Sequence, residues 1–250
     1  ILNITPDHIE RHKSFKNYIK AKFRLIDSQS TKSVAFVKRN DPVIVKKLRS
    51  KKYKQKIIKI DTSLQPPIFK KIRNTYFMSS GNRENLIFVL KICKILKLNE
   101  EKILRTVNKF KGLKYRQQII FVDNNLTIIN DSKSTSLASS ENLLKNLKNV
   151  YWILCGIPKK RDKFNLTKSQ CKNFKGYIFG KHQIQFIKNL KNKLTIKKFK
   201  NIKDTLNQRF LEIKNNKREK NTILFSPAGA PFDYFKNFEY RGLYFNQIVK

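Results

Sequence analysis

Short apolar runs alternate with amphipathic segments through the second half of the chain. The apolar runs are QQIIFV (117–122), LTIIN (126–130), VYWILC (150–155), GYIFG (176–180) and TILFS (222–226). The amphipathic segments cover about 137–148, 182–191, 203–216 and 233–249. Since most runs lack the alternation of a half-exposed strand, they predict strands buried on both faces, in a largely parallel sheet covered by helices. The expected fold class is therefore α/β.

A tight turn joins the first two runs. Only DNN, residues 123–125, separates them. Asp and Asn favour turns because their side chains bond to nearby backbone groups, so the two runs predict a β-hairpin.

The first half of the chain has a less regular pattern. ILNI, at the start, and SVAFV read as strands, and TPDHIERH between them reads as a loop. FKNYIKAKFRLI (15–26) predicts an amphipathic helix. ENLIFVLKICKILKL (84–98) and EEKILRTVNKF (100–110) predict consecutive helices, with Asn99 as a stop or cap. KGLKYRQQ, near 111–118, is the expected domain junction.

Three polar loops follow predicted strands of the second half. They are NDSKSTS (130–136), GIPKKRD (156–162) and SPAGAPFD (226–233). In parallel sheets, ligands bind beyond the carboxyl ends of the strands. We therefore expect the three loops to open on one edge of the sheet and to form a binding site.

NDSKSTS allows two interpretations. Ser134 or Ser136 can simply cap the helix that follows. Alternatively, Lys133, the loop N–H groups and the positive end of the helix dipole hold a carboxylate or phosphate. Lys159 in the second loop and Ser226 in the third would contribute to the same anion site.

The composition permits a substantial core but carries an unusual charge. The chain has 250 residues, 40% of them hydrophobic, with 19 Phe and 9 Tyr, and a net charge of +39. The excess is mainly Lys spread along the whole length, beside many Asn and Ile residues, which is typical of AT-rich coding. A basic chain also raises nucleic-acid binding, but no zinc-finger spacing, RNP-like motif or Arg-rich arm supports it.

Targeting and redox signals are weak. No apolar run approaches the roughly 20 residues of a membrane-spanning helix, and the first residues do not have a signal-peptide pattern. Three scattered cysteines lack metal-ligand spacing and fit a reducing cytoplasm.

Two histidines and one lysine in the first half have no role that the pattern reveals. His8 and His12 lie in DHIERH, but no further His or Cys stands at zinc-site spacing. Lys22 cannot be distinguished from the other lysines of its predicted helix. Pattern and charge leave these three residues unassigned.

Several motifs resemble those of the Mur ligases. ILNITPDHIERHKSFKNYIKAKFRLI is similar to that family's N-x-x-x-D-H-x-D-R-H followed by E-N-Y-x-x-A-K. NDSKSTS resembles N-D-S-K-A-T-N, and GLKYRQQ resembles G-L-P-H-R-x-E at the start of the family's last domain. SPAGAPFDYFKNFEYRG resembles S-P-A-x-A-S-x-D-x-F-K-N-F-x-x-R-G. The matches run in order along the chain, with 27–80 weakly matched.

The resemblance implies the later part of a central P-loop-type ATPase domain (1–112), followed by a Rossmann-like carboxy-terminal domain (113–250). It implies an ATP- and Mg²⁺-dependent amide ligase of peptidoglycan synthesis, in the branch that adds D-glutamate to UDP-N-acetylmuramoyl-L-alanine through an acyl phosphate. We expect a cytoplasmic monomer without nucleic-acid or membrane partners. Another Mur or folylpolyglutamate-type ligase, and a non-enzymatic nucleic-acid-binding protein, remain alternatives.

The resemblance also implies site residues. His8 would be a catalytic magnesium ligand, and Lys22, as a carbamate, an oxygen ligand of the same ion. Asn82 and Asn85 would contact the nucleotide. Arg116 and Asp131 would complete the ATP site, and the carboxylates of D-glutamate would be bound by Lys133, Thr135, Lys159, Ser226 and the backbone around Phe235.

The chain departs from the family pattern at several positions. Tyr115 replaces the usual His, Ser136 the final Asn of its loop, Cys155 a Gly, and Pro231 a small polar residue. Pro231 has no N–H and so loses any donor role. A phosphate loop of G-T-x-G-K-[ST] type is missing from these 250 residues, so we expect them not to turn over ATP by themselves.

Overall fold

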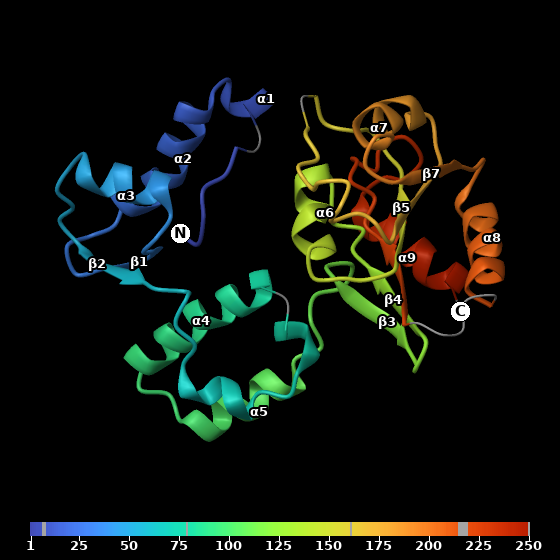
Figure 1. Cartoon of the computed structure of the whole chain (residues 1–250). Helices are drawn as coiled ribbons and strands as arrows, with labels where there is room; N and C mark the ends of the chain where they lie inside the picture. The colour runs from blue at the N-terminus through green and yellow to red at the C-terminus, as the bar shows by residue number, and fades with distance from the viewer. Residues whose placement is uncertain (7–8, 79, 161, 215–219, 250) are drawn as a thin grey trace. The chain divides into compact units, whose positions relative to one another are not determined.

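The computed structural model describes residues 1–6, 9–78, 80–160, 162–214 and 220–249. They form two compact units, Ile1–Phe110 and Lys111–Lys250, which Figure 1 colours from blue to green and from green to red. Among the described residues, no helix combines the length and the apolar character that a bilayer crossing requires.

The first unit is mainly helical and contains a small sheet. Its helices are α1 (Ile9–His12), α2 (Phe15–Asp27), α3 (Pro42–Arg49), α4 (Ser80–Ile95) and α5 (Glu100–Lys109), with 3₁₀ turns η1 (Pro67–Lys71) and η2 (Thr75–Met78). β1 (Val34–Lys38) and β2 (Lys56–Ile60) pair in parallel. Among the described residues, its core consists of three apolar clusters, two of which share the partly buried Phe69.

Side-chain caps start three of these helices. Ser14 accepts a hydrogen bond from the Asn17 N–H at the start of α2, and Asn99 accepts one from the Lys102 N–H at the start of α5. Asp41 caps α3 and also accepts from the Ile4 N–H, which ties the first residues to this helix.

Most predictions for the first unit are confirmed. The helices at 15–26, 84–98 and 100–110 exist, and SVAFV forms β1. ILNI is not a strand, although Ile1 exchanges two backbone hydrogen bonds with β1. TPDHIERH is not wholly a loop, because Ile9–His12 form α1. The prediction also did not include α3, β2 or the 3₁₀ turns. α3, β2 and η1 are short, contain lysines and bury one side chain each, so their apolar pattern is weak.

The second unit is built on a six-stranded sheet. Its strands are β3 (Gln118–Val122), β4 (Leu126–Asn130), β5 (Val150–Leu154), β6 (Phe174–Ile178), β7 (Thr195–Lys198) and β8 (Asn221–Phe225), in the order β3-β4-β8-β5-β6-β7. Only the edge strand β3 is antiparallel to its neighbour. The helices are α6 (Leu137–Leu144), α7 (Gln183–Leu190), α8 (Ile202–Lys214) and α9 (Phe238–Val249).

Helices cover both faces of this sheet. Along the fully buried β5, Trp152 and Leu154 pack into one apolar cluster with residues of α6 and α7. Tyr151 and Ile153 point to the opposite cluster, which contains residues of α8 and α9. This arrangement confirms the predicted α/β class and explains why β5 reads as a continuous apolar run.

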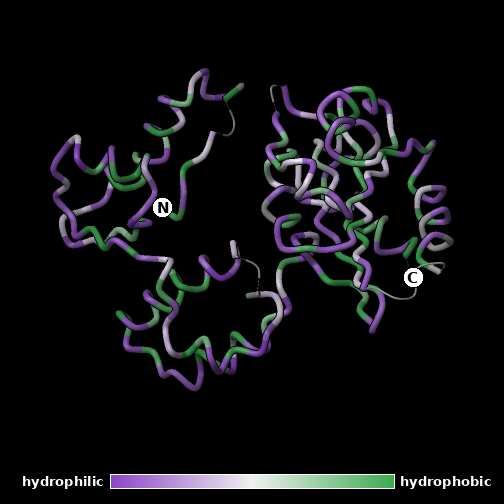
Figure 2. The backbone as a smooth tube through the Cα atoms, in the orientation of Figure 1, coloured by the Kyte–Doolittle hydropathy of each residue, from purple (hydrophilic) through white to green (hydrophobic). Residues whose placement is uncertain are grey.

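The element boundaries differ from the predictions in three places. α6 ends at Leu144 rather than near 148, and α9 begins at Phe238 rather than near 233. The third difference is β7, whose sequence TIKK was not predicted to be a strand, because three of its four side chains are exposed. Figure 2 shows hydrophilic positions along both units, in agreement with dispersed lysine charge.

Candidate functional site

The three predicted loops lie at one edge of the second unit. β4, β8 and β5 are adjacent and parallel, so their carboxyl ends at Asn130, Phe225 and Leu154 lie side by side. The loops that follow these ends are 131–136, 226–237 and 155–162. The expectation that they open on one edge is therefore confirmed.

A chain of hydroxyl groups connects two of these loops. The Ser226 hydroxyl donates to Asp131 (2.9 Å) and lies 2.7 Å from the Ser140 hydroxyl, which lies 2.8 Å from that of Ser134. Ser226 is fully buried, and its carbonyl accepts from the Trp152 indole at 2.7 Å. Ser226 thus lies in the interior of the site, and a direct contact with substrate, as its predicted role requires, would displace one of these partners.

Asp131 is the acid at the end of this chain. It is 7% exposed, and its second oxygen accepts from the Gln117 N–H at 3.1 Å. Burial raises the pKa of Asp131 to about 7, although the Ser226 and Gln117 hydrogen bonds act in the opposite direction. Its predicted part in an ATP site stays a prediction.

The start of α6 has both a side-chain cap and a bound carboxylate, the two features that the alternative interpretations of NDSKSTS proposed. Ser136 caps the helix and forms a reciprocal capping box with Ser139, as the simpler interpretation predicts. The amide of Leu137, at the first helical position, donates to the carboxylate of Asp162. Asp162 comes from the loop after β5, so the helix terminus already binds a carboxylate of the chain itself.

The contact with Asp162 removes the first amides of α6 from the predicted anion site. The first amides of α6 bind Asp162 rather than remaining open to a ligand. Burial raises the pKa of Asp162, while these amides and the nearby Lys159 lower it. The consequence is that Asp162 holds the 155–162 loop, and therefore Lys159, next to α6.

The side chains of Lys133 and Thr135 remain available to bind a ligand. The Lys133 ammonium lies 3.9 Å from the ring centroid of Phe238, a cation–π distance, and both Lys133 and Thr135 are half-buried. Within the described part of the chain, neither side chain has an acid partner or a hydrogen bond to a side chain. An ordered cation without an acid partner is suited to an anionic ligand.

Phe238 and Arg241 are site residues that the sequence interpretation missed. The prediction named the backbone around Phe235, and it stays a prediction. The Phe235 ring packs on that of Tyr244, with centroids 5.7 Å apart, while Phe238 lies under Lys133. Arg241 is fully buried between the loops. The spacing of Phe238, Arg241 and Phe245 follows one helix face, so an arginine on an apolar stripe was the available signal.

The segment before β3 forms a strained turn against α9. Tyr115 and Gln117 have left-handed backbone angles, φ 62° and 49°. A Cβ atom on Gly242 would lie 2.3 Å from the Tyr115 ring, so only glycine fits at that helix position. Arg116 is exposed at this turn, and its predicted ATP contact stays a prediction.

The predicted nucleotide residues of the first unit border an apolar cavity of about 290 Å³. Asn82 is buried and donates to the Tyr76 carbonyl at 2.9 Å, and Asn85 is exposed at the rim. Among the other lining residues are Tyr76, Phe77, Leu86, Val107 and Phe110. Flat aromatic walls with two amides are suited to a planar heterocycle.

The predicted magnesium site stays a prediction. His8 lies outside the described residues. Lys22 is exposed on α2, with its ammonium 5.2 Å from the Tyr18 ring centroid. No group of three His, Cys, Asp or Glu side chains suited to a metal occurs in the described ranges.

Comparison with known proteins places these motifs in a family. Residues 1–99 match the Mur ligase middle domain. The chain is 33% identical to the UDP-N-acetylmuramoylalanine–D-glutamate ligase of Wolbachia sp. subsp. Brugia malayi, over 97% of this chain and 51% of that protein. It is 29% identical to the same ligase of Rickettsia felis, over 100% and 60%. The chain thus spans about half to three-fifths of these relatives.

Solved structures agree in fold. MurF from Acinetobacter baumannii matches all of this chain and 59% of its own length, with a TM-score of 0.68 at 15% identity. UDP-N-acetylmuramate-alanine ligase MurC from Thermotoga maritima also covers the whole chain, with a TM-score of 0.57 at 14% identity. These solved structures show the fold, while the middle-domain match over residues 1–99 and the near-complete alignment to D-glutamate ligases show that the chain is similar to Mur ligases along its whole length.

Proposed function

We propose that the chain is the carboxy-terminal portion of an ATP-dependent ligase that adds D-glutamate to UDP-N-acetylmuramoyl-L-alanine. The observation that carries the proposal is the meeting of three loops at one sheet edge, with Lys133 and Lys159 on the two loops that flank the loop after β8. The similarity to D-glutamate ligases along nearly the whole chain supports the same reaction.

The second unit would bind the amino acid. D-Glutamate carries two carboxylates, and the edge offers two lysines and the Thr135 hydroxyl. Asp162 at the α6 terminus is a carboxylate held beside Lys159, which supports the view that this edge tolerates negative charge. Lys133, fixed over Phe238, would grip the other carboxylate, so that the free amine is left to react.

The first unit would contribute to the nucleotide site. The cavity bordered by Asn82 and Asn85 has the aromatic lining that a purine base requires. A solved relative, MurF from Thermotoga maritima, is described as a complex with ADP. ATP would convert the substrate carboxylate into an acyl phosphate, because a free carboxylate is a poor electrophile. Attack by the amine then releases phosphate and forms the amide.

An equilibrium binding assay tests the substrate assignment. We expect the 250-residue protein to bind D-glutamate, with L-glutamate, D-alanine and L-lysine as weak competitors. Lys133→Ala should weaken binding roughly tenfold or more, since a charge-assisted contact is lost. Lys163→Ala, at an exposed lysine, is the matched control and should have no effect.

Two outcomes would reject the proposal. Preference for another amino acid would assign the chain to a sibling ligase. Tight binding to duplex DNA with a steep salt dependence, without D-glutamate binding, would instead support a nucleic-acid-binding role.

A further inference from the structure

Arg241 of α9 connects two of the site loops directly. Its side chain is fully buried. Nε donates to the Ser132 hydroxyl at 3.1 Å, Nη2 to the Ser132 carbonyl at 2.7 Å, and Nη1 to the Gly229 carbonyl at 2.9 Å. The planar guanidinium is suited to such a set, since its donors point in fixed directions.

Each of these carbonyls belongs to a peptide group that holds another segment. The N–H of Lys133, in the same peptide group as the Ser132 carbonyl, donates to the Tyr115 carbonyl at 3.0 Å. The N–H of Ala230, paired in the same way with the Gly229 carbonyl, donates to the Ile157 carbonyl at 2.8 Å. Because the C=O and N–H of a trans peptide point in opposite directions, Arg241 fixes these two donors as well.

Four segments are therefore joined through one side chain. They are the turn before β3 and the loops after β4, β5 and β8. Hydrogen bonds in such chains polarise one another, so that each strengthens the next.

The charge of Arg241 has no ion-pair partner. Within the described ranges, no carboxylate lies within 4.0 Å of its nitrogens. The neighbouring Cys155 is a neutral thiol, because burial raises its pKa to about 12. The direct acceptors of Arg241 are neutral, and Asp233 and Asp131 attract its charge from a greater distance. A buried guanidinium without an ion pair is costly for stability, so a simple core role would be served better by an apolar side chain.

The surrounding backbone leaves no room for a different arrangement. At Gly156, φ 92°, an added Cβ would lie 2.9 Å from Nη1 of Arg241 and 2.4 Å from the Ala230 carbonyl. At Gly229, it would lie 2.6 Å from the Cys155 carbonyl. The loops thus enclose the guanidinium on the side of β5 as well.

We propose that Arg241 is the positioning residue of this edge: its guanidinium fork sets the relative placement of the loops that carry Lys133 and Lys159. The fork geometry, rather than the charge alone, performs this role. The consequence for D-glutamate binding rests on the proposed function, whereas the consequence for the loops does not.

Amide hydrogen exchange, measured by NMR on the 250-residue protein, tests the role without a ligand. In Arg241→Lys and Arg241→Gln, the amides of Lys133 and Ala230 should exchange roughly tenfold faster or more, because charge-assisted hydrogen bonds are lost. Amides of the central strand β5 should keep their protection. Tyr240→Gln, at an exposed neighbour on α9, is the control and should change neither group.

Unchanged exchange at Lys133 and Ala230 in the folded variants would overturn the proposal. Full protection in Arg241→Lys would overturn it too, since lysine keeps the charge but not the fork.

The wild-type protein offers a second test if both variants fail to fold. A guanidinium held at both ends should give separate, slowly exchanging Nη proton resonances for Arg241. One averaged resonance, as for an exposed arginine, would contradict the proposal. If the amide exchange and the Nη resonances both give the expected results but the wild type does not bind D-glutamate, the proposed function is rejected and the positioning role of Arg241 is retained.

Discussion

The two units place their apolar side chains in different ways. In the second unit, helices cover both faces of a six-stranded sheet, and β5 and β8 are buried along their whole length. The first unit divides its core into three clusters around a two-stranded parallel sheet. It leaves Leu25 65% exposed and Val89 48% exposed, and both border an apolar groove that also includes Phe88 and Ile92.

The candidate sites of the two units also differ in how they are built. The loops of the second unit are fixed by buried hydrogen bonds of their own unit. In the first unit, Asn82 and Asn85 border an apolar cavity of about 290 Å³. Parallel strands are ordinarily covered on both faces, so the first unit carries less of its own stabilisation. The hydrogen bonds that join the three candidate loops lie within the second unit.

Separating the units should have the largest effect. We expect residues 111–250 to unfold cooperatively on heating, because two continuous clusters span their sheet. Residues 1–110 should lack a cooperative transition and should bind a hydrophobic dye, since their core is divided into three clusters and one of their apolar grooves is open. Calorimetry and dye fluorescence are the measurements. A cooperative transition of residues 1–110 at a similar temperature would remove the contrast between the units.

A glycine-to-alanine substitution should have opposite effects on the free energy of unfolding in the two units. Gly242→Ala should destabilise the second unit by about 2 kcal/mol or more, because its Cβ would overlap the Tyr115 ring. Gly81→Ala should stabilise the first unit by up to about 1 kcal/mol, since nothing lies near its added Cβ and alanine favours helix. Urea unfolding measures both.

Adding Tyr115→Gly to Gly242→Ala tests the cause. The double variant should recover part of the lost free energy of unfolding, because the overlapping ring is removed and glycine accepts φ 62°. A loss equal to the sum of the two single losses would show that this ring is not the cause.

Asp131→Asn should change the pH dependence of stability. The folded pKa of Asp131, about 7, is above its ordinary 3.8. Between these values the folded state retains a proton that the unfolded state releases, so this group's stabilising contribution falls as pH rises from about 4 to 7. The variant should show a flatter profile in that range. Identical profiles for both proteins would place the folded pKa near its ordinary value.

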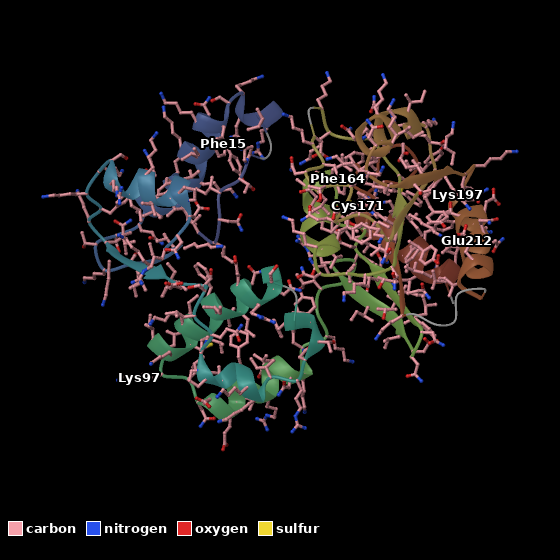
Figure 3. All side chains as sticks on the ribbon, viewed as in Figure 1. Phe15, Lys97, Phe164, Cys171, Lys197 and Glu212 are labelled. Carbon is pink, nitrogen blue, oxygen red and sulfur yellow. The ribbon has the colours of Figure 1, made fainter. Side chains whose placement is uncertain are left out.

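The smallest expected difference between the two units is in the free energy of unfolding that their ion pairs contribute. Glu212 accepts from Lys197 (2.8 Å), Lys175 (3.1 Å) and Tyr177 (2.7 Å), and Figure 3 shows it beside Lys197. Burial acts to raise its pKa, but these donors lower it to about 2. Their stabilisation should be present above pH 4.5 and should disappear as pH falls through about 2.

Glu212→Gln should cost about 1 kcal/mol at neutral pH, a modest figure because both lysines are half exposed. Glu100→Gln in the first unit is the matched control. Its pair with Lys71 is exposed on both sides, so the free energy of unfolding should hardly change. Equal costs at the two positions would contradict the difference in burial.

Sequence patterns predicted the second unit better than the first because burial was more complete there. VYWILC and TILFS could be recognised as strands since every side chain of β5 and β8 is buried. TIKK could not, because an edge strand with exposed lysines has no apolar signal. The late start of α9 depends on the turn at Pro231, whose carbonyl accepts from the Tyr234 and Phe235 amides.

The candidate site was predictable in its location but not in its internal contacts. The spacing of the loops after apolar strands was sufficient to place them on one edge. The contact between Asp162 and α6 joins residues 25 positions apart, and the burial of Ser226 depends on the packing of Trp152 and Ser140 around it. Such long-range contacts leave no local pattern.

NMR mapping of D-glutamate binding on the 250-residue protein would show whether the three loops form one amino-acid site. We expect saturable shifts at the backbone amides of Lys133, Thr135 and Lys159 together, and their loss in Lys133→Ala but not in Lys163→Ala. Shifts confined to other parts of the chain, or none at saturating D-glutamate, would contradict the proposed site.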